Sequence, residues 1–169
     1  MIAKRSPIEA FDCILNITAF LGALLLIVQM ILVNADIVLR YFLNSPIRGA
    51  SEIAEVSLLY LTFLGAAWLL RCEGHISVDI LAARLSERTL VGLRFLTSAL
   101  GCLIFAVLSW SGAKVTYGLW AKDVVTPTIL ELPRAGIVII IPLGCFLLCV
   151  QFARRAIKAW RSRKLPIKK

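Results

Sequence analysis

The segment LLRCEGHISVDIL, residues 69–81, holds the side chains best suited to chemistry. It contains the single histidine of the chain, His75, with Cys72, Glu73 and Asp79 close by. Thiolate, imidazole and carboxylate groups bind zinc and also act as nucleophiles and bases. A metal needs more ligands than this loop supplies, and no nucleophile with its base and orienting group is apparent. We therefore interpret the segment as a structural corner rather than an active site.

The corner requires a helix on each side of a turn. Arg71 ends the preceding apolar segment at a membrane surface, and Gly74 allows the chain to turn. The ring of His75 can then bond a backbone carbonyl, Asp79 or a partner chain. Apolar and polar residues alternate with helical spacing over residues 77–87, which predicts a short amphipathic helix at the membrane surface. Our candidate structural loop consists of Arg71, Gly74, His75 and Asp79.

The other cysteines also invite a metal or redox interpretation. Cys13, Cys102, Cys145 and Cys149 all fall inside apolar segments, where a free thiol behaves as a small hydrophobic group. No histidine or carboxylate lies near Cys145 and Cys149 to complete a tetrahedral set. We expect packing roles for these thiols, and we expect no catalytic residue, no metal and no cofactor.

Composition sets the environment of these residues. Hydrophobic residues make up 60% of the 169 positions and charged residues 17%, and the mean hydropathy is +0.88. These values are typical of an integral membrane protein, in which spanning segments must be helical to satisfy their backbone. We predict an all-α membrane protein, a single membrane domain over residues 1–169 with four transmembrane helices. The expected spans are residues 11–39, 50–71, 90–116 and 134–157, and Pro142 should kink the last one.

The distribution of positive charge predicts the orientation. With four spans, both tails share one side with the middle loop, and that side carries 14 of the 19 lysines and arginines. Such residues are retained in the cytoplasm, so both termini should be cytoplasmic. The first apolar run is too long for a typical secretory signal and should remain as an anchor. The basic tail, residues 154–169, follows a membrane span directly, which favours anionic lipid over nucleic acid as its partner.

Charged residues cluster at those ends of the first two spans that lie opposite the expected cytoplasmic side. Asp36 and Arg40 are four apart on the continuation of the first helix, so they can form an ion pair. Glu52 and Glu55 lie at the start of the second helix, where the helix dipole favours carboxylates, and Arg48 lies between the two pairs. Two interpretations remain open: a charge network between the helices, or a docking surface for another protein.

Several short motifs, in this order, resemble the small membrane subunit of tripartite ATP-independent periplasmic (TRAP) transporters, the DctQ-type family. The resemblance covers about residues 11–155. The motifs are RYFLNSP at 40–46, Glu52, FLGAA at 63–67, R-x-x-GHISVDIL at 71–81, LP at 132–133 and IPLG at 141–144. Two places depart from the family pattern, because IRGAS and RAGIV lack the aromatic residue that often follows the first loop proline and the LP pair.

The resemblance implies a role that composition does not. In such transporters a periplasmic binding protein delivers an organic acid to the membrane complex, and a sodium gradient drives uptake. A large DctM-type subunit holds the substrate and sodium sites and moves as an elevator. The small subunit is a scaffold in the bacterial inner membrane that anchors the large subunit and helps to dock the binding protein. The implied partners are therefore these two proteins and membrane lipids, with no nucleic acid and no enzymatic activity.

Two other classes of function remain to be weighed. A self-sufficient homo-oligomeric transporter or channel would need polar residues lining a pore, and Asn16, Thr18 and Gln29 are the few candidates. A membrane enzyme or redox subunit would have to use His75 and Cys72. One histidine cannot provide the two axial ligands of a b-type haem within one chain.

Overall fold

A computed structural model describes residues 7–73 and 87–164 of the chain. Its helices are α1 (Pro7–Leu43), α2 (Ala50–Glu73), α4 (Glu87–Ala121), α5 (Arg134–Val138) and α6 (Ile140–Lys164). Within the described residues the only strand-like pairing is an isolated bridge between Val125 and Pro133. The predicted surface helix lies outside the described residues except for Glu87, which begins α4, so it stays a prediction.

Four helical segments are long and apolar enough to cross a membrane. They are Phe11–Leu43, Ala50–Cys72, Val91–Ala121 and Arg134–Trp160. Each exceeds the roughly 20 residues that a bilayer core requires. The prediction of an all-α membrane protein with four transmembrane helices is therefore confirmed.

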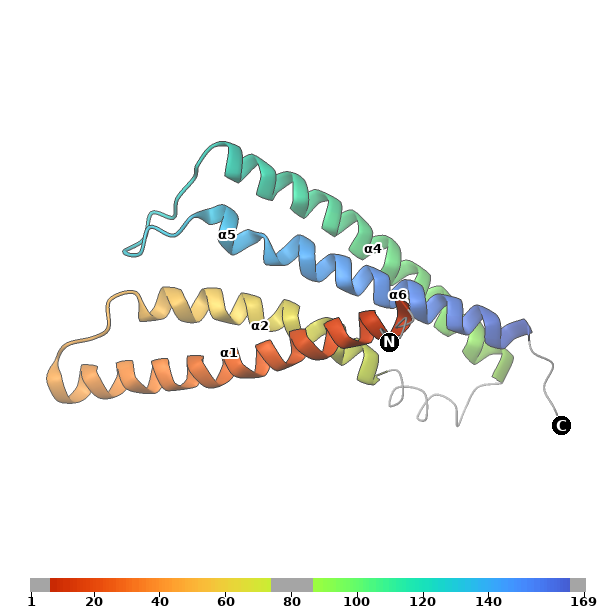
Figure 1. Cartoon of the computed structure of the whole chain (residues 1–169), viewed down its shortest axis with the longest axis horizontal. Coiled ribbons are helices and arrows are strands. Elements are labelled where there is room, and N and C mark those ends of the chain that lie inside the picture. The colour runs from red at the N-terminus through yellow and green to blue at the C-terminus, as the bar shows by residue number, and fades with distance from the viewer. Residues whose placement is uncertain (1–6, 74–86, 165–169) are drawn as a thin grey trace, which may run out of the picture.

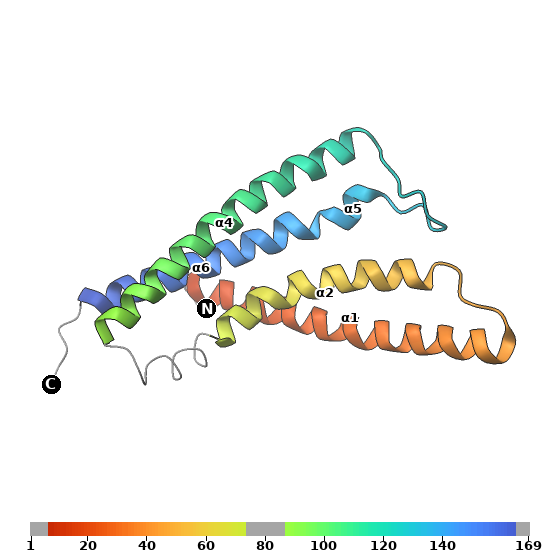
Figure 2. The same ribbon diagram turned by 180° about the vertical axis from the view of Figure 1, so that it is seen from behind.

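The helices form two pairs that diverge along their length (Figures 1 and 2). One pair is α1 with α2. The other is α4 with the fourth span, which consists of α5 and α6. The two pairs contact each other where α2 packs against α6. The pairs converge where both described termini lie, which we call the terminal end. At the opposite end, which we call the hairpin end, residues 44–49 form the first connection, between α1 and α2. Residues 122–133 form the second connection, between α4 and α5. The helix axes of the two pairs therefore lie further apart toward the hairpin end.

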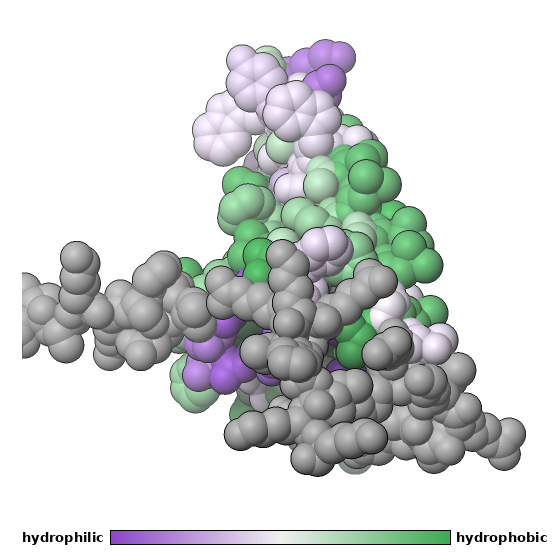
Figure 3. Space-filling model, turned by 90° about the vertical axis from the view of Figure 1, so that its right-hand side faces the viewer, coloured by the Kyte–Doolittle hydropathy of each residue, from purple (hydrophilic) through white to green (hydrophobic). Residues whose placement is uncertain are grey.

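A small core lies where the two pairs converge. Leu15, Ala67 and Leu148, from α1, α2 and α6, are buried against one another. Most apolar side chains elsewhere are exposed: Phe20, Met30 and Leu103 are 69%, 62% and 65% exposed. Figure 3 shows hydrophobic side chains covering the middle of one face, with hydrophilic ones at the top of the view. Such a surface requires lipid or a membrane partner around it.

The last span is interrupted close to the predicted proline kink. Because Pro142 has no N–H and its ring clashes with the carbonyl four residues earlier, the helix cannot continue regularly through Val138. Accordingly α5 ends at Val138 and α6 begins at Ile140. The carbonyl of Pro142 accepts a hydrogen bond from the Ser109 hydroxyl of α4, at 3.1 Å. The interruption is thus stabilised by the neighbouring helix.

Close helix contact also depends on glycine. A Cβ atom on Gly144 of α6 would lie 2.7 Å from the Cβ of Phe63 on α2, and one on Gly101 would lie 2.8 Å from the Phe152 ring. Small residues at such positions let helix backbones approach closely in a bilayer. These two contacts set how α6 lies between α2 and α4.

Candidate functional site

Asp36 organises the first connection at the hairpin end. This carboxylate is only 7% exposed. One oxygen accepts a hydrogen bond from the Arg40 guanidinium at 2.7 Å, and the other accepts from the backbone N–H of Ile47 at 2.8 Å. Asn44 takes a left-handed conformation, with φ +46°, where the chain leaves α1. Asp36 therefore neutralises a nearby cation and ties residues 44–49 back to α1.

Glu52 of α2 joins that helix to the second connection. Its carboxylate oxygens accept hydrogen bonds from the backbone N–H groups of Ile129, at 3.0 Å, and Leu130, at 3.3 Å. Beside this contact Gly49 has φ +80°, and a Cβ atom there would lie 1.7 Å from the Leu130 side chain. Glycine is thus required both by the backbone conformation and by the packing. The two helix pairs are locked together here although their helices diverge.

A second link between the pairs lies beside these hydrogen bonds of Glu52, which we call the Glu52 lock. The Tyr60 hydroxyl of α2 donates a hydrogen bond to the carbonyl of Gly136 in α5, at 2.5 Å. Charged hydrogen bonds at Glu52 and a neutral one at Tyr60 therefore hold α2 to the segment that precedes α6. Together they fix the geometry of the space between them.

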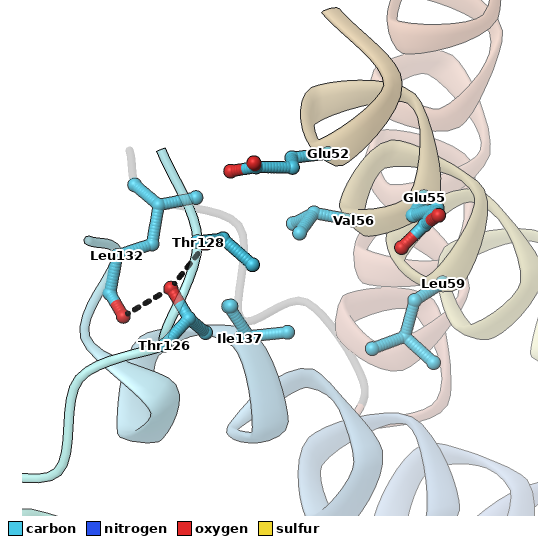
Figure 4. Close-up of a pocket in the computed structure, with 8 residues that line it drawn as sticks. All are labelled: Glu52, Glu55, Val56, Leu59, Thr126, Thr128, Leu132 and Ile137. Atoms are coloured by element: carbon cyan, nitrogen blue, oxygen red, sulfur yellow. Dashed lines mark hydrogen bonds between the residues drawn. The ribbon is translucent and has the colours of Figure 1, made fainter. Parts of the chain in front are cut away.

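That space is a notch of about 330 Å³ between α2, the second connection and α5 (Figure 4). Its lining residues come from all three segments: Glu52, Glu55, Val56, Leu59, Thr126, Thr128, Leu132 and Ile137. Glu55 is exposed. Arg48, in the first connection, is also exposed. Neither side chain has an ion pair among the described residues.

The five charged residues singled out in the sequence thus have different surroundings. Asp36, Arg40 and Glu52 make contacts within the chain. Arg48 and Glu55 are exposed, have no ion pair among the described residues and are available to other molecules. The network and docking interpretations therefore each fit part of the set, and both stay predictions.

The candidate structural loop is described only at its first residue. Arg71 of α2 donates hydrogen bonds to the backbone carbonyl of Asp12, at 3.4 Å, and to the side-chain oxygen of Asn16, at 3.2 Å. Gly74, His75 and Asp79 lie outside the described residues. Arg71 therefore joins α2 to α1 at the terminal end.

A charge cluster that we did not predict continues from Arg71. The Asp12 carboxylate of α1 accepts a hydrogen bond from the Arg154 guanidinium of α6 at 2.7 Å, in an ion pair whose side chains are about one-third exposed. The same guanidinium lies 5.0 Å from the centre of the Phe11 ring. The sequence signal was present, because a carboxylate at the edge of an apolar span is rarely without a partner. Its partner, 142 residues away, could not be identified from spacing.

The cysteines do not form a metal site in the described part of the chain. The sulfur atoms of Cys102 on α4 and Cys149 on α6 lie 3.6 Å apart. No group of three or more cysteine, histidine, aspartate or glutamate side chains that could hold a metal is found among residues 7–73 and 87–164. The thiol pair therefore forms part of the contact between α4 and α6.

Comparison with known proteins decides the family. The family model described as "Tripartite ATP-independent periplasmic transporters, DctQ component" matches residues 29–162, most of the chain. The protein belongs to the DctQ family. The matched region includes the Asp36 and Glu52 contacts and three complete spans. The resemblance identified from the motifs is therefore confirmed.

Curated proteins similar to this DctQ family member carry related names. The C4-dicarboxylate TRAP transporter small permease protein DctQ of Rhodobacter capsulatus is 26% identical over 129 residues, which cover 73% of this chain and 56% of that protein. A putative TRAP transporter small permease protein of Haemophilus influenzae is 33% identical over 95 residues, which cover 56% and 58% of the two chains. The chain thus matches a little over half the length of these relatives.

The Glu52 lock predicts a local effect of substitution in this DctQ protein. Glu52→Ala should speed amide hydrogen exchange at Ile129 and Leu130 by about tenfold. A hydrogen bond to a charged group contributes roughly 1.5–3 kcal/mol, and these two bonds should lie at the low end of that range because they are exposed or only partly buried. Glu55→Ala, one turn along the same helix, is the matched control and should leave both amides unchanged. Equal exchange in wild type and Glu52→Ala would show that the lock does not restrain the connection.

The Asp12–Arg154 pair predicts coupling between α1 and α6. Asp12→Asn and Arg154→Gln should each lower the unfolding free energy by about 1 kcal/mol, a value reduced for partial exposure. The double variant should lose less than the sum of the two. Thermal unfolding of the four proteins in one detergent measures this coupling, and strictly additive losses would contradict a direct interaction.

Proposed function

We propose that this protein is the small scaffold subunit of a sodium-coupled TRAP transporter that imports organic acids. A periplasmic binding protein delivers the acid, and a large DctM-type subunit carries out transport in the bacterial inner membrane. The observation that carries the proposal is the DctQ family match over residues 29–162 of a chain with four membrane spans. The protein itself acts without enzymatic activity or a cofactor.

The scaffold role is supported by the large apolar surface that the chain leaves uncovered. At most 28% of the most apolar stretch of any span is buried within the chain. The two helix pairs are nevertheless fixed at both ends, by Asp12 with Arg154 and by Glu52 with the second connection. A rigid frame with broad apolar faces suits a static subunit that lipids and the large subunit surround.

Docking of the binding protein is assigned to the hairpin end. This end faces the periplasm if both termini are cytoplasmic, as the distribution of lysine and arginine favours. Its connections are held by Asp36 and Glu52, and Arg48 projects from them without an ion pair among the described residues. A fixed, exposed cation there suits an acidic surface on a soluble partner. The basic tail at the other end meets anionic lipid.

The alternative of an independent channel receives no support from the polar residues of α1. Thr18 donates to the carbonyl of Leu15 on its own helix. Gln29 donates to the carbonyl of Ala54, and Asn16 accepts from Arg71. Each side chain is thus engaged within the chain.

Reconstitution tests the proposed function. The wild-type chain, co-expressed with the large DctM-type subunit, should co-purify with it. Proteoliposomes with both subunits and the binding protein should take up substrate along a sodium gradient, whereas those with this chain alone should show none. Sodium-driven uptake by this chain alone, or failure to retain the large subunit, would disprove the scaffold role.

The docking assignment has its own test. Arg48→Glu should raise the concentration of binding protein needed for half-maximal uptake by about fivefold, because one exposed charge pair is lost and a repulsion is added. Lys122→Glu, at the end of the other helix pair, serves as the comparison and should have the smaller effect. An unchanged requirement in Arg48→Glu, with normal complex yield, would remove this residue from the docking surface.

A further inference from the structure

The notch of Figure 4 has two chemically distinct levels along α2. Glu52 and Glu55 lie close to the helix start, nearer the membrane surface. Leu59 lies one turn further into the span, about 6 Å beyond Glu55 at 1.5 Å per residue. Val56, Leu132 and Ile137 complete the apolar lining. The notch is therefore acidic at its rim and apolar toward the bilayer interior.

The polar groups of the notch are almost all hydrogen-bond acceptors. The Thr128 hydroxyl donates to the Thr126 hydroxyl at 2.8 Å, and the Thr126 hydroxyl donates to the carbonyl of Leu132 at 3.2 Å. Both hydroxyl protons are thus used within the loop. The carboxylates of Glu52 and Glu55 have no protons to donate when ionised. A molecule that satisfies this notch must supply donors, and positive charge would also balance Glu55.

We propose that the notch receives a lysine or arginine side chain from a transmembrane helix of the large subunit. This inference rests on the proposed function. Lysine and arginine are donor-only groups on apolar stems, and in membranes they extend along apolar surface toward the polar interface. A stem lying over Val56, Leu59 and Ile137 would place its charged group beside Glu55, which matches the order of the two levels.

The order of the acidic and apolar levels favours this occupant over two others, a basic side chain of a soluble protein and a phosphatidylethanolamine headgroup. A basic side chain of a soluble protein would enter from the membrane surface, so its charge would stop at the carboxylates and its apolar stem would stay outside, leaving Leu59 and Ile137 uncovered. A phosphatidylethanolamine headgroup carries a phosphate next to its ammonium, and that anion would face two carboxylates and no free donor. A membrane-embedded basic side chain has neither mismatch.

The first experiment measures retention of the large subunit by full-length variants. Glu55→Gln keeps the shape of the side chain but removes its charge, and should lower the large subunit recovered after a stringent wash by about fivefold. Glu131→Gln, an exposed carboxylate on the second connection outside the notch lining, is the control and should retain it fully. Wild-type recovery in Glu55→Gln overturns the inference but leaves the proposed function intact, whereas failure of the wild type to co-purify overturns both.

The second experiment identifies the occupant. A photo-crosslinking amino acid in place of Leu59, in the assembled complex, should label the large subunit next to a lysine or arginine. Replacing that basic residue by glutamate should abolish recovery, and combining it with Glu55→Lys should restore it. Crosslinks to the binding protein or to lipid alone, or no restoration by the charge exchange, would overturn the inference.

Discussion

The backbone amides at the hairpin end need acceptors, and two carboxylates supply them. Residues of a connection have no intrahelical partner for their N–H groups, and they lie close to a medium that cannot solvate such groups. Asp36 accepts from Ile47, and Glu52 accepts from Ile129 and Leu130. The first contact fixes the connection of residues 44–49 to α1, and the second fixes the connection of residues 122–133 to α2. The positions of the two connections, and the shape of the notch beside Glu52, depend on these bonds.

The two helix pairs are therefore closed at both ends by different chemistry. At the terminal end, side chains bond one another beside the core of Leu15, Ala67 and Leu148: Arg154 pairs with Asp12, and Arg71 donates to the amide oxygen of Asn16. At the hairpin end, charged side chains meet the backbone. Between these closures α2 and α6 touch where Gly144 admits Phe63. A frame built in this way buries little of its apolar surface within the chain, which suits a membrane-spanning member of the DctQ family.

The same physics explains which residues are engaged and which are not. Three polar side chains within the spans, Thr18, Gln29 and Ser109, find acceptors on the chain itself, which matters because an unsatisfied group in hydrocarbon costs several kcal/mol. Arg48 and Glu55 sit near the surface, where water lowers that cost, so they can remain available for partners. The polar side chains within the spans and those proposed for recognition are thus separated by depth.

The sequence by itself determined the four helices and the family, because hydropathy over some 20 residues and the order of short motifs are local properties. It also located Asp36 and Arg40 as a possible pair, since four residues is one helical turn. The role of His75 and the surface helix remain predictions. Only the tertiary structure decided that Glu52 binds backbone amides some 77 residues away and that Asp12 meets Arg154. Those contacts follow from how α2 and α6 lie against each other, which depends on the packing of side chains from several helices and has no counterpart in sequence spacing.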